Sequence, residues 1–267
     1  MLTHFSLCSG IGGLDLAAEW AGFCTVAQCE IDGYASRVLA KNFPGVHNFG
    51  DIRTVTNESA RAAGIAVEKI TVLSAGFPCQ PYSLAGKGLG DGDERDLWGE
   101  VARIIHVLGP RWFVGENTPG LFARAGQKYF TRILADLVSL GYCVSWGIWG
   151  ACDVGAAHKR NRVFLVAHTD GERRRSVAKV SQNRRVPLGI SALPFGSVWE
   201  KETRKTAELL LCLHRSLPEP SGGFLRNDNG VPEALDRIKC LGNAVVPQQA
   251  FPIFKAIADY ENGKGVL

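Results

Sequence analysis

The sequence predicts an α/β protein with a doubly wound, mostly parallel β-sheet. Over the first 168 residues, short apolar runs alternate with stretches whose apolar residues recur at helical spacing. Glycine or proline follows several of these runs, as expected where a buried strand ends. Because strands that alternate with helices pack as a parallel sheet covered on both faces, the pattern favours the doubly wound class.

The predicted elements follow one another in a regular order. The first strand, 4–8, leads into a helix at 14–20, and a second strand at 25–29 precedes a helix that Asp32 is expected to cap. A third strand is expected to end near 50–52. The later predicted elements are strands at 70–75, 112–114, about 143–149 and 163–167, and helices at about 97–108, 130–140 and after Pro247.

Composition limits the class of protein. The chain has 267 residues, of which 46% are hydrophobic and 21% charged, as is ordinary for a globular protein with a full core. No apolar run has membrane-spanning length and the N-terminus carries no secretory pattern, so a cytoplasmic protein is expected. The eight cysteines are scattered without a Cys-x-x-Cys pair, which predicts reduced thiols and no zinc site.

Three regions are expected along the chain. Residues 1–168 form the regular α/β part, 169–235 a short region without clear periodicity, and 236–267 a C-terminal segment that returns to the first part. Residues 170–239 hold thirteen Lys and Arg against nine Asp and Glu, so they account for the whole net charge of +4. Such a segment suits contact with a polyanion, or is simply a solvated basic surface.

A single cysteine stands between two prolines in Gly76-Phe77-Pro78-Cys79-Gln80-Pro81, directly after the predicted strand 70–75. Proline fixes φ and has no N–H, so the backbone around Cys79 is stiff and cannot continue the strand. A thiol on a rigid loop at a strand end suits a nucleophile. The residues around it leave open the alternative of a small, inert core cysteine.

A second group of motifs follows the first strands of the sheet. Cys8-Ser9-Gly10-Ile11-Gly12-Gly13 lies between a strand and a helix, where glycines let a ligand approach the backbone. Glu30-Ile31 and Asp51-Ile52 follow the next two strands, and a carboxylate there suits ribose hydroxyls. This order of motifs favours a binding site for a nucleoside-containing cofactor. The alternative is that the glycines are only structural and the carboxylates only cap helices.

Charged residues also mark the later strands. Glu116 and Asn117 end the strand that begins at Trp112, and so are expected at the same sheet edge as Cys79. Arg160 and Arg162 precede the strand 163–167, where alternation would direct both side chains to one side. Such a pair suits a phosphate or a carbonyl, or is an exposed strand start.

These motifs, taken in order, resemble the DNA (cytosine-5) methyltransferases of compact bacterial or phage type. The resemblance rests on the glycine-rich opening, Glu30, Asp51, the motif around Cys79, Glu116-Asn117 and Arg160-x-Arg162, and on Leu241-Gly242-Asn243-Ala244-Val245-Val246-Pro247. It covers the chain from Phe5 to about Ala167 and resumes near Asp236. It implies a Rossmann-like S-adenosylmethionine-dependent fold, with 169–235 as a short target-recognition region.

The resemblance also implies roles for single residues. Cys79 would attack carbon 6 of a flipped cytosine, Glu116 would hold a proton at ring nitrogen 3, and Arg160 and Arg162 would approach the base. Glu30 would bind the ribose hydroxyls of S-adenosyl-L-methionine. The other positions expected around that cofactor are Cys8, Gly10, Ile11, Gly13, Ile31, Asp51, Ile52, Pro78, Leu97, Asn243 and Ala244.

The implied reaction is methylation of carbon 5 of cytosine in specific sequences of double-stranded DNA by a monomer. The resemblance allows a cognate restriction endonuclease as a partner, in a restriction-modification system. Two alternatives stay open: a tRNA cytosine methyltransferase with the same fold, and a DNA-binding relative without catalysis. The basic segment disfavours the first, and the intact Cys79, Glu116 and Arg160-x-Arg162 set disfavours the second.

Overall fold

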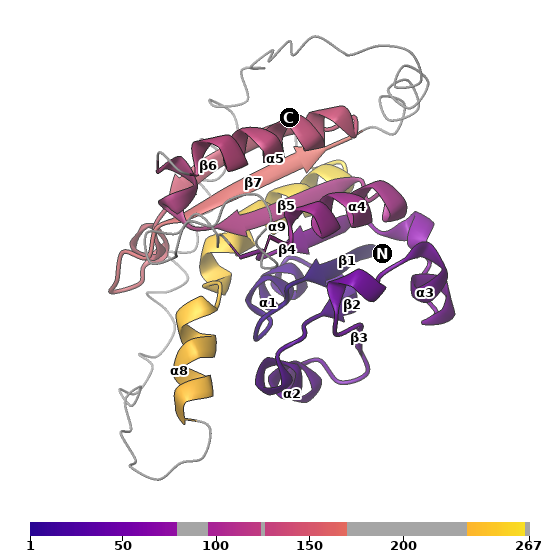
Figure 1. Ribbon diagram of the computed structural model, residues 1–267, viewed down its shortest axis with the longest axis horizontal. Coiled ribbons are helices and arrows are strands. Elements are labelled where there is room, and N and C mark those ends of the chain that lie inside the picture. Colours follow the sequence, from indigo (N-terminus) through magenta and orange to yellow (C-terminus); the bar gives the residue numbers. More distant parts are fainter. Residues whose placement is uncertain (79–95, 124–125, 170–233, 265–267) are drawn as a thin grey trace.

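The computed structural model describes residues 1–78, 96–123, 126–169 and 234–264 (Figure 1). Within these ranges the strands form one seven-stranded sheet in the order β3-β2-β1-β4-β5-β7-β6. The strands are β1 (Leu2–Leu7), β2 (Phe23–Cys29), β3 (His47–Asn48), β4 (Val72–Ala75), β5 (Trp112–Asn117), β6 (Cys143–Trp149) and β7 (Arg162–His168).

The sheet is parallel except at one strand. β3, β2, β1, β4 and β5 run in the same direction, whereas β7 is antiparallel to both of its neighbours, β5 and β6. The chain builds outward from β1 to β2 and β3 on one side and continues through β4 and β5 on the other. This confirms the predicted doubly wound class and puts the switch in strand order between β1 and β4, where such sheets bind ligands.

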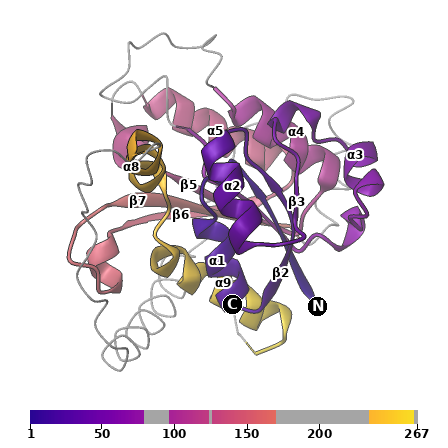
Figure 2. The same cartoon turned by 90° about the horizontal axis from the view of Figure 1, so that it is seen from below.

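Helices cover both faces of the sheet (Figure 2). On one face, α1 (Gly13–Trp20) and α9 (Pro247–Glu261) pack together over Val72, Trp112 and Phe164. On the other face, α4 (Trp98–Leu108) and α5 (Gln127–Ser139) bury a larger core against β1, β4, β5 and β7. The remaining helices are α2 (Gly33–Asn42), α3 (Asn57–Ala62) and α8 (Ala234–Asn243), with short 3₁₀ turns η1 (Ile52–Thr54), η2 (Val67–Lys69), η3 (Pro119–Phe122) and η4 (Ala151–Val154).

The predicted start of one helix agrees with the structure, whereas the predicted end of the third strand does not. The Asp32 carboxylate accepts hydrogen bonds from the backbone N–H groups of Tyr34 and Ala35, so the predicted cap of α2 is confirmed. The third strand is shorter than the sequence indicated, because β3 ends at Asn48 and Asp51 instead caps η1 through Arg53 N. Helices α3 and α8 were not predicted.

Two features of the sequence lie beyond the described residues. Cys79 falls outside them, and so does nearly all of the irregular region 169–235. None of the helices in the described ranges has the length and apolar character that a membrane span requires.

Candidate active site

The candidate residues gather at one edge of the sheet because its parallel strands end there. Asp51, Glu30 and the glycine-rich loop follow β3, β2 and β1, and Gly76 follows β4. Glu116 is near the end of β5. β7 runs the other way and pairs Glu116 with Phe164, so its first residue, Arg162, arrives at this same edge.

Glu116 is the buried charged group of this edge. Its side chain is 9% exposed, and its Oε1 lies 2.8 Å from Nε of Arg162. Burial raises the pKa of Glu116 to about 7, and the nearby positive charges of Arg162 and Arg160 oppose that rise. Glu116 is therefore more readily protonated near neutral pH than an ordinary glutamate, which suits a group that donates to a ring nitrogen.

The backbone that leads to Cys79 is held against Glu116 and its neighbour. The Asn117 side-chain amide donates a 2.9 Å hydrogen bond to the Phe77 carbonyl, and the buried Phe77 ring lies 5.3 Å from that of Trp98. A Cβ at Gly76 would lie 3.6 Å from Glu116 Oε2 and 3.6 Å from the Cys8 carbonyl oxygen. The chain therefore enters the Cys79 motif beside both Glu116 and the glycine-rich loop.

The glycine-rich loop needs backbone conformations that glycine favours. Gly10 and Gly12 have φ of 56° and 88°, and Cys8 takes a φ of 50° despite its side chain. The Gly10 N–H donates a 2.8 Å hydrogen bond to Glu30 Oε2, which connects the loop to the end of β2. A Cβ at Gly13 would lie 2.3 Å from the Val245 carbonyl oxygen, so the C-terminal segment packs directly on the loop.

A cleft of about 450 Å³ lies between this loop and the segment that joins α8 to α9. Its lining residues come from the loop, from the start of α1, from the turn before β7 and from the C-terminal segment: Ile11, Gly12, Gly13, Leu16, His158, Arg160, Leu241, Ala244, Val245, Val246 and Pro247. Residues 158–160 and 241–247 therefore meet the loop although they are far from it in sequence.

Arg160 and Arg162 both lie near enough to Glu116 to affect its pKa, but the strand alternation that was expected to bring them to one side is wrong. β7 begins only at Arg162, and Arg160 takes a φ of 36°, so the two residues do not share an extended backbone. Nη2 of Arg160 donates to the carbonyls of Gly242, at 2.7 Å, and Ala244, while Arg162 pairs with Glu116. Arg160 thus fixes the C-terminal segment to the site.

Comparisons with known proteins agree with this geometry. The family model of the C-5 cytosine-specific DNA methylases matches residues 2–207. The chain belongs to this family. Type II methyltransferase M.HgiCII of Herpetosiphon aurantiacus is 30% identical over 261 residues, which is 96% of this chain and 53% of the relative. Type II methyltransferase M.NgoBI of Neisseria gonorrhoeae is 36% identical over 171 residues, which is 64% of this chain and 51% of the relative.

Solved structures share the fold of this chain. A prophage-encoded E. coli protein assigned as a DNA modification methyltransferase is 28% identical, with a TM-score of 0.56, over 64% of this chain and 48% of that one. Spodoptera frugiperda DNMT2 has 22% identity and a TM-score of 0.52, over 64% of this chain and 50% of that one. The chain spans about half the length of the two curated relatives named above.

The remaining residues expected at the cofactor differ in exposure. Ile31, beside Glu30, is 71% exposed, as would suit an apolar surface that a flat ring covers. Gly10 has open space where a Cβ would be, so the loop leaves room for a ligand. Ile52 is buried in the core, Leu97 precedes α4, Pro78 is half-buried, and Asn243 is exposed at the end of α8.

The candidate site also depends on residues that sequence reasoning missed. Gln249, fully buried in α9, donates to the carbonyls of Trp149 and Arg160, both at 3.1 Å, and so holds the turn before β7. The available signal was a polar residue four and eight positions before the buried Ile253 and Ile257, and so on the buried face of α9. In the part of the chain that the structure describes, no cluster of His, Cys, Asp and Glu suits a metal ion.

A cluster of buried polar groups is hydrogen-bonded to Ser9 of the glycine-rich loop. Asp15 Oδ1 accepts hydrogen bonds from Ser6 Oγ, at 2.7 Å, and from Gln28 Nε2, at 3.0 Å. Ser6 Oγ is 2.6 Å from Ser9 Oγ, which in turn accepts from the Cys29 N–H. Asp15 is fully buried, and this burial raises its pKa to about 6.

Replacing Asp15 with asparagine is expected to change how stability depends on pH. Because the folded pKa of about 6 exceeds the ordinary 3.8, the protonated carboxyl favours the folded state below about pH 4. That contribution is lost as the pH rises to about 6. The free energy of unfolding of Asp15→Asn, relative to wild type, should therefore rise over this interval by on the order of 3 kcal/mol. Urea unfolding at pH 4 and pH 7 measures it, and an equal pH dependence in both proteins would contradict it.

Proposed function

We propose that this chain transfers a methyl group from S-adenosyl-L-methionine to carbon 5 of cytosine in specific sequences of double-stranded DNA. The observation that carries the proposal is the buried Glu116, with a pKa of about 7, paired with Arg162 beside the backbone that enters the Cys79 motif. Membership of the C-5 cytosine-specific DNA methylases supports the reaction class. A monomer that works with a cognate restriction endonuclease is part of the same proposal.

The cofactor would occupy the side of the site formed by the ends of β1, β2 and β3. Glu30 would accept hydrogen bonds from the ribose hydroxyls through oxygens that already hold the N–H groups of Gly10 and Asp32. Ile31 and the turn at Asp51 and Ile52 would contact the adenine. When bound, S-adenosyl-L-methionine supplies a methyl group on a positively charged sulfur, which makes that carbon open to attack.

The chemistry assigned to the chain's own residues begins at Cys79. Carbon 5 of cytosine is a weak nucleophile, so the Cys79 thiolate first forms a bond to carbon 6. Glu116 donates its proton to ring nitrogen 3 as the ring gains electrons, and Arg162 holds the carboxyl in place. Carbon 5 then takes the methyl group. Loss of the carbon 5 proton to water, release of the Cys79 thiolate and return of the nitrogen 3 proton to Glu116 restore the ring and the carboxyl group.

The target carbon cannot be reached inside a duplex, so the cytosine must leave the base stack and enter the site. The basic residues of 169–235 would contact phosphates and base edges and so select the sequence. Residues 1–168 and 236–267 carry the catalytic and cofactor motifs. We therefore propose that these two regions perform the reaction and that 169–235 selects the DNA sequence.

Transfer of tritium from methyl-labelled S-adenosyl-L-methionine tests the proposed function. We expect label in duplex DNA of mixed sequence, in a product that digests to 5-methylcytosine, and none in bulk tRNA. Label in tRNA with none in DNA would favour the tRNA methyltransferase. Absence of label from both, in a protein that still binds duplex DNA, would favour the relative without catalysis.

A further inference from the structure

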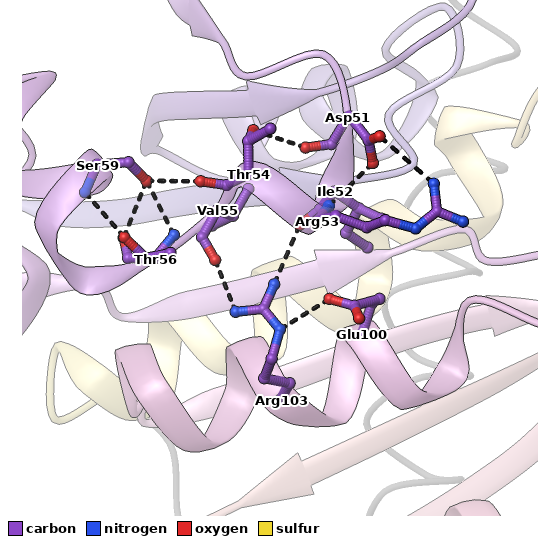
Figure 3. Close-up of polar contacts among 9 residues, drawn as sticks. All are labelled: Asp51, Ile52, Arg53, Thr54, Val55, Thr56, Ser59, Glu100 and Arg103. Atoms are coloured by element: carbon purple, nitrogen blue, oxygen red, sulfur yellow. Dashed lines mark hydrogen bonds and ion pairs between the residues drawn. The ribbon is translucent and has the colours of Figure 1, made fainter.

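An arginine of α4 bonds to the turn that follows β3. Arg103 donates from Nη1 to the Val55 carbonyl at 2.8 Å and from Nη2 to the Ile52 carbonyl at 3.2 Å (Figure 3). Its Nε donates to Glu100 Oε2 at 2.7 Å, one turn earlier on the same helix. Two nitrogens of one guanidinium thus connect α4 to a segment about fifty residues earlier in the chain, and the third nitrogen bonds within α4.

The turn has few other attachments to the sheet. β3 has only two residues and pairs with β2 alone, and η1 has three residues. Most of the polar contacts of this turn are internal: Asp51 accepts from Arg53 N, Thr54 Oγ1 donates to the Asp51 carbonyl, and Ser59 Oγ donates to the Thr54 carbonyl (Figure 3). Because so short a 3₁₀ turn has weak internal hydrogen bonds, its position depends on outside partners. These are the core, in which the Ile52 and Val55 side chains are buried, and the guanidinium of Arg103.

The residues that Arg103 fixes are expected at the cofactor. Asp51 and Ile52 begin this turn, and the Ile52 carbonyl is itself an Arg103 acceptor. Leu97, another expected cofactor neighbour, directly precedes α4, the helix that carries Arg103. One side chain therefore connects two parts of the chain that are both expected near the cofactor.

We propose that Arg103, oriented by Glu100, is a positioning residue that holds the turn at Asp51 and Ile52 against the adenine end of the cofactor. The inference rests on the proposed function, because the ligand is S-adenosyl-L-methionine. Arg103 does not touch the ligand and acts only through the turn. A lysine has the same charge but no planar fork, so it cannot serve both carbonyls and the Glu100 carboxylate together.

Calorimetric titration of the full chain with S-adenosylhomocysteine tests the proposal. Arg103→Lys is expected to raise the dissociation constant about tenfold or more, as the loss of charge-assisted hydrogen bonds implies. KM for the cofactor should rise equally, and kcat at saturation should change less than about twofold. The matched control is Arg61→Lys on α3, whose exposed Arg61 contacts Asn57 and Glu68 and should leave the affinity unchanged.

A double-mutant cycle separates positioning from general destabilisation. In an Asp51→Ala background, Arg103→Lys should weaken binding clearly less than it does in the wild-type background, because one of the two contacts that Arg103 positions is already gone. An equal penalty in both backgrounds, or wild-type affinity in Arg103→Lys, would overturn the positioning role alone. If the wild-type chain binds no S-adenosylhomocysteine, the proposed function fails together with this inference.

Discussion

Replacing Cys79 with serine is expected to lower methyl transfer at least about 10⁴-fold, because a hydroxyl at neutral pH is a far weaker nucleophile than a thiolate. Single-turnover transfer of labelled methyl groups to duplex DNA measures the change. The affinity for S-adenosylhomocysteine should stay within about twofold of wild type, since the thiol acts on the base.

Cys24→Ser is the matched control for this change. Cys24 is exposed in β2 and pairs with Thr3 near the opposite edge of the sheet, so its replacement should leave the transfer rate unchanged. A Cys79→Ser protein that keeps a tenth or more of the wild-type rate would argue against covalent catalysis by this residue.

Replacing Glu116 with glutamine is expected to lower kcat by about 10²- to 10⁴-fold, because the amide cannot give up a proton to ring nitrogen 3. The wild-type rate should fall as the pH rises above about 7, since Glu116 then loses the proton that it donates. That alkaline decline should be missing from the residual rate of Glu116→Gln. Measurements of kcat from pH 5.5 to 9 test both statements.

Stability serves as the control for the Glu116 variant. The folded pKa of about 7 exceeds the ordinary 4.5, so the contribution of Glu116 to stability is full below about pH 4.5 and is lost as the pH rises to about 7. Glu116→Gln should therefore be folded, and no less stable than wild type, at pH 8. A folded variant with near wild-type kcat, or with the same alkaline decline, would exclude Glu116 as the proton donor.

The helices and strands that could be predicted from the sequence are those marked by a pattern of neighbouring residues. Alternating apolar runs and glycine-rich turns identified β1, α1, β2 and β4, and the single residue Asp32 identified the start of α2. Helix α3 also had a local signal, since Thr56 and Ser59 form a reciprocal capping box, but that signal was overlooked. The sheet class followed because alternation of strands and helices leaves few arrangements.

The contacts around the site could not be predicted because they depend on packing between distant segments. Arg160 appeared to belong to a strand, yet its backbone is left-handed and its side chain meets Gly242 and Ala244. The direction of β7 decides that Arg162 reaches Glu116, and no local pattern distinguishes a parallel from an antiparallel strand at this position. The position of Arg103 against the turn at Ile52 likewise appears only in the folded chain.

The central claim is that Cys79 attacks carbon 6 of an extruded cytosine beside Glu116. Incubation with S-adenosyl-L-methionine and duplex DNA of random sequence containing 5-fluorocytosine tests it most directly, because fluorine leaves no proton at carbon 5 to be removed. The account predicts a complex that survives denaturation, with the DNA mass on the peptide that contains Cys79, and no such complex for Cys79→Ser. Absence of a complex with the wild-type protein, or attachment at another residue, would contradict the account.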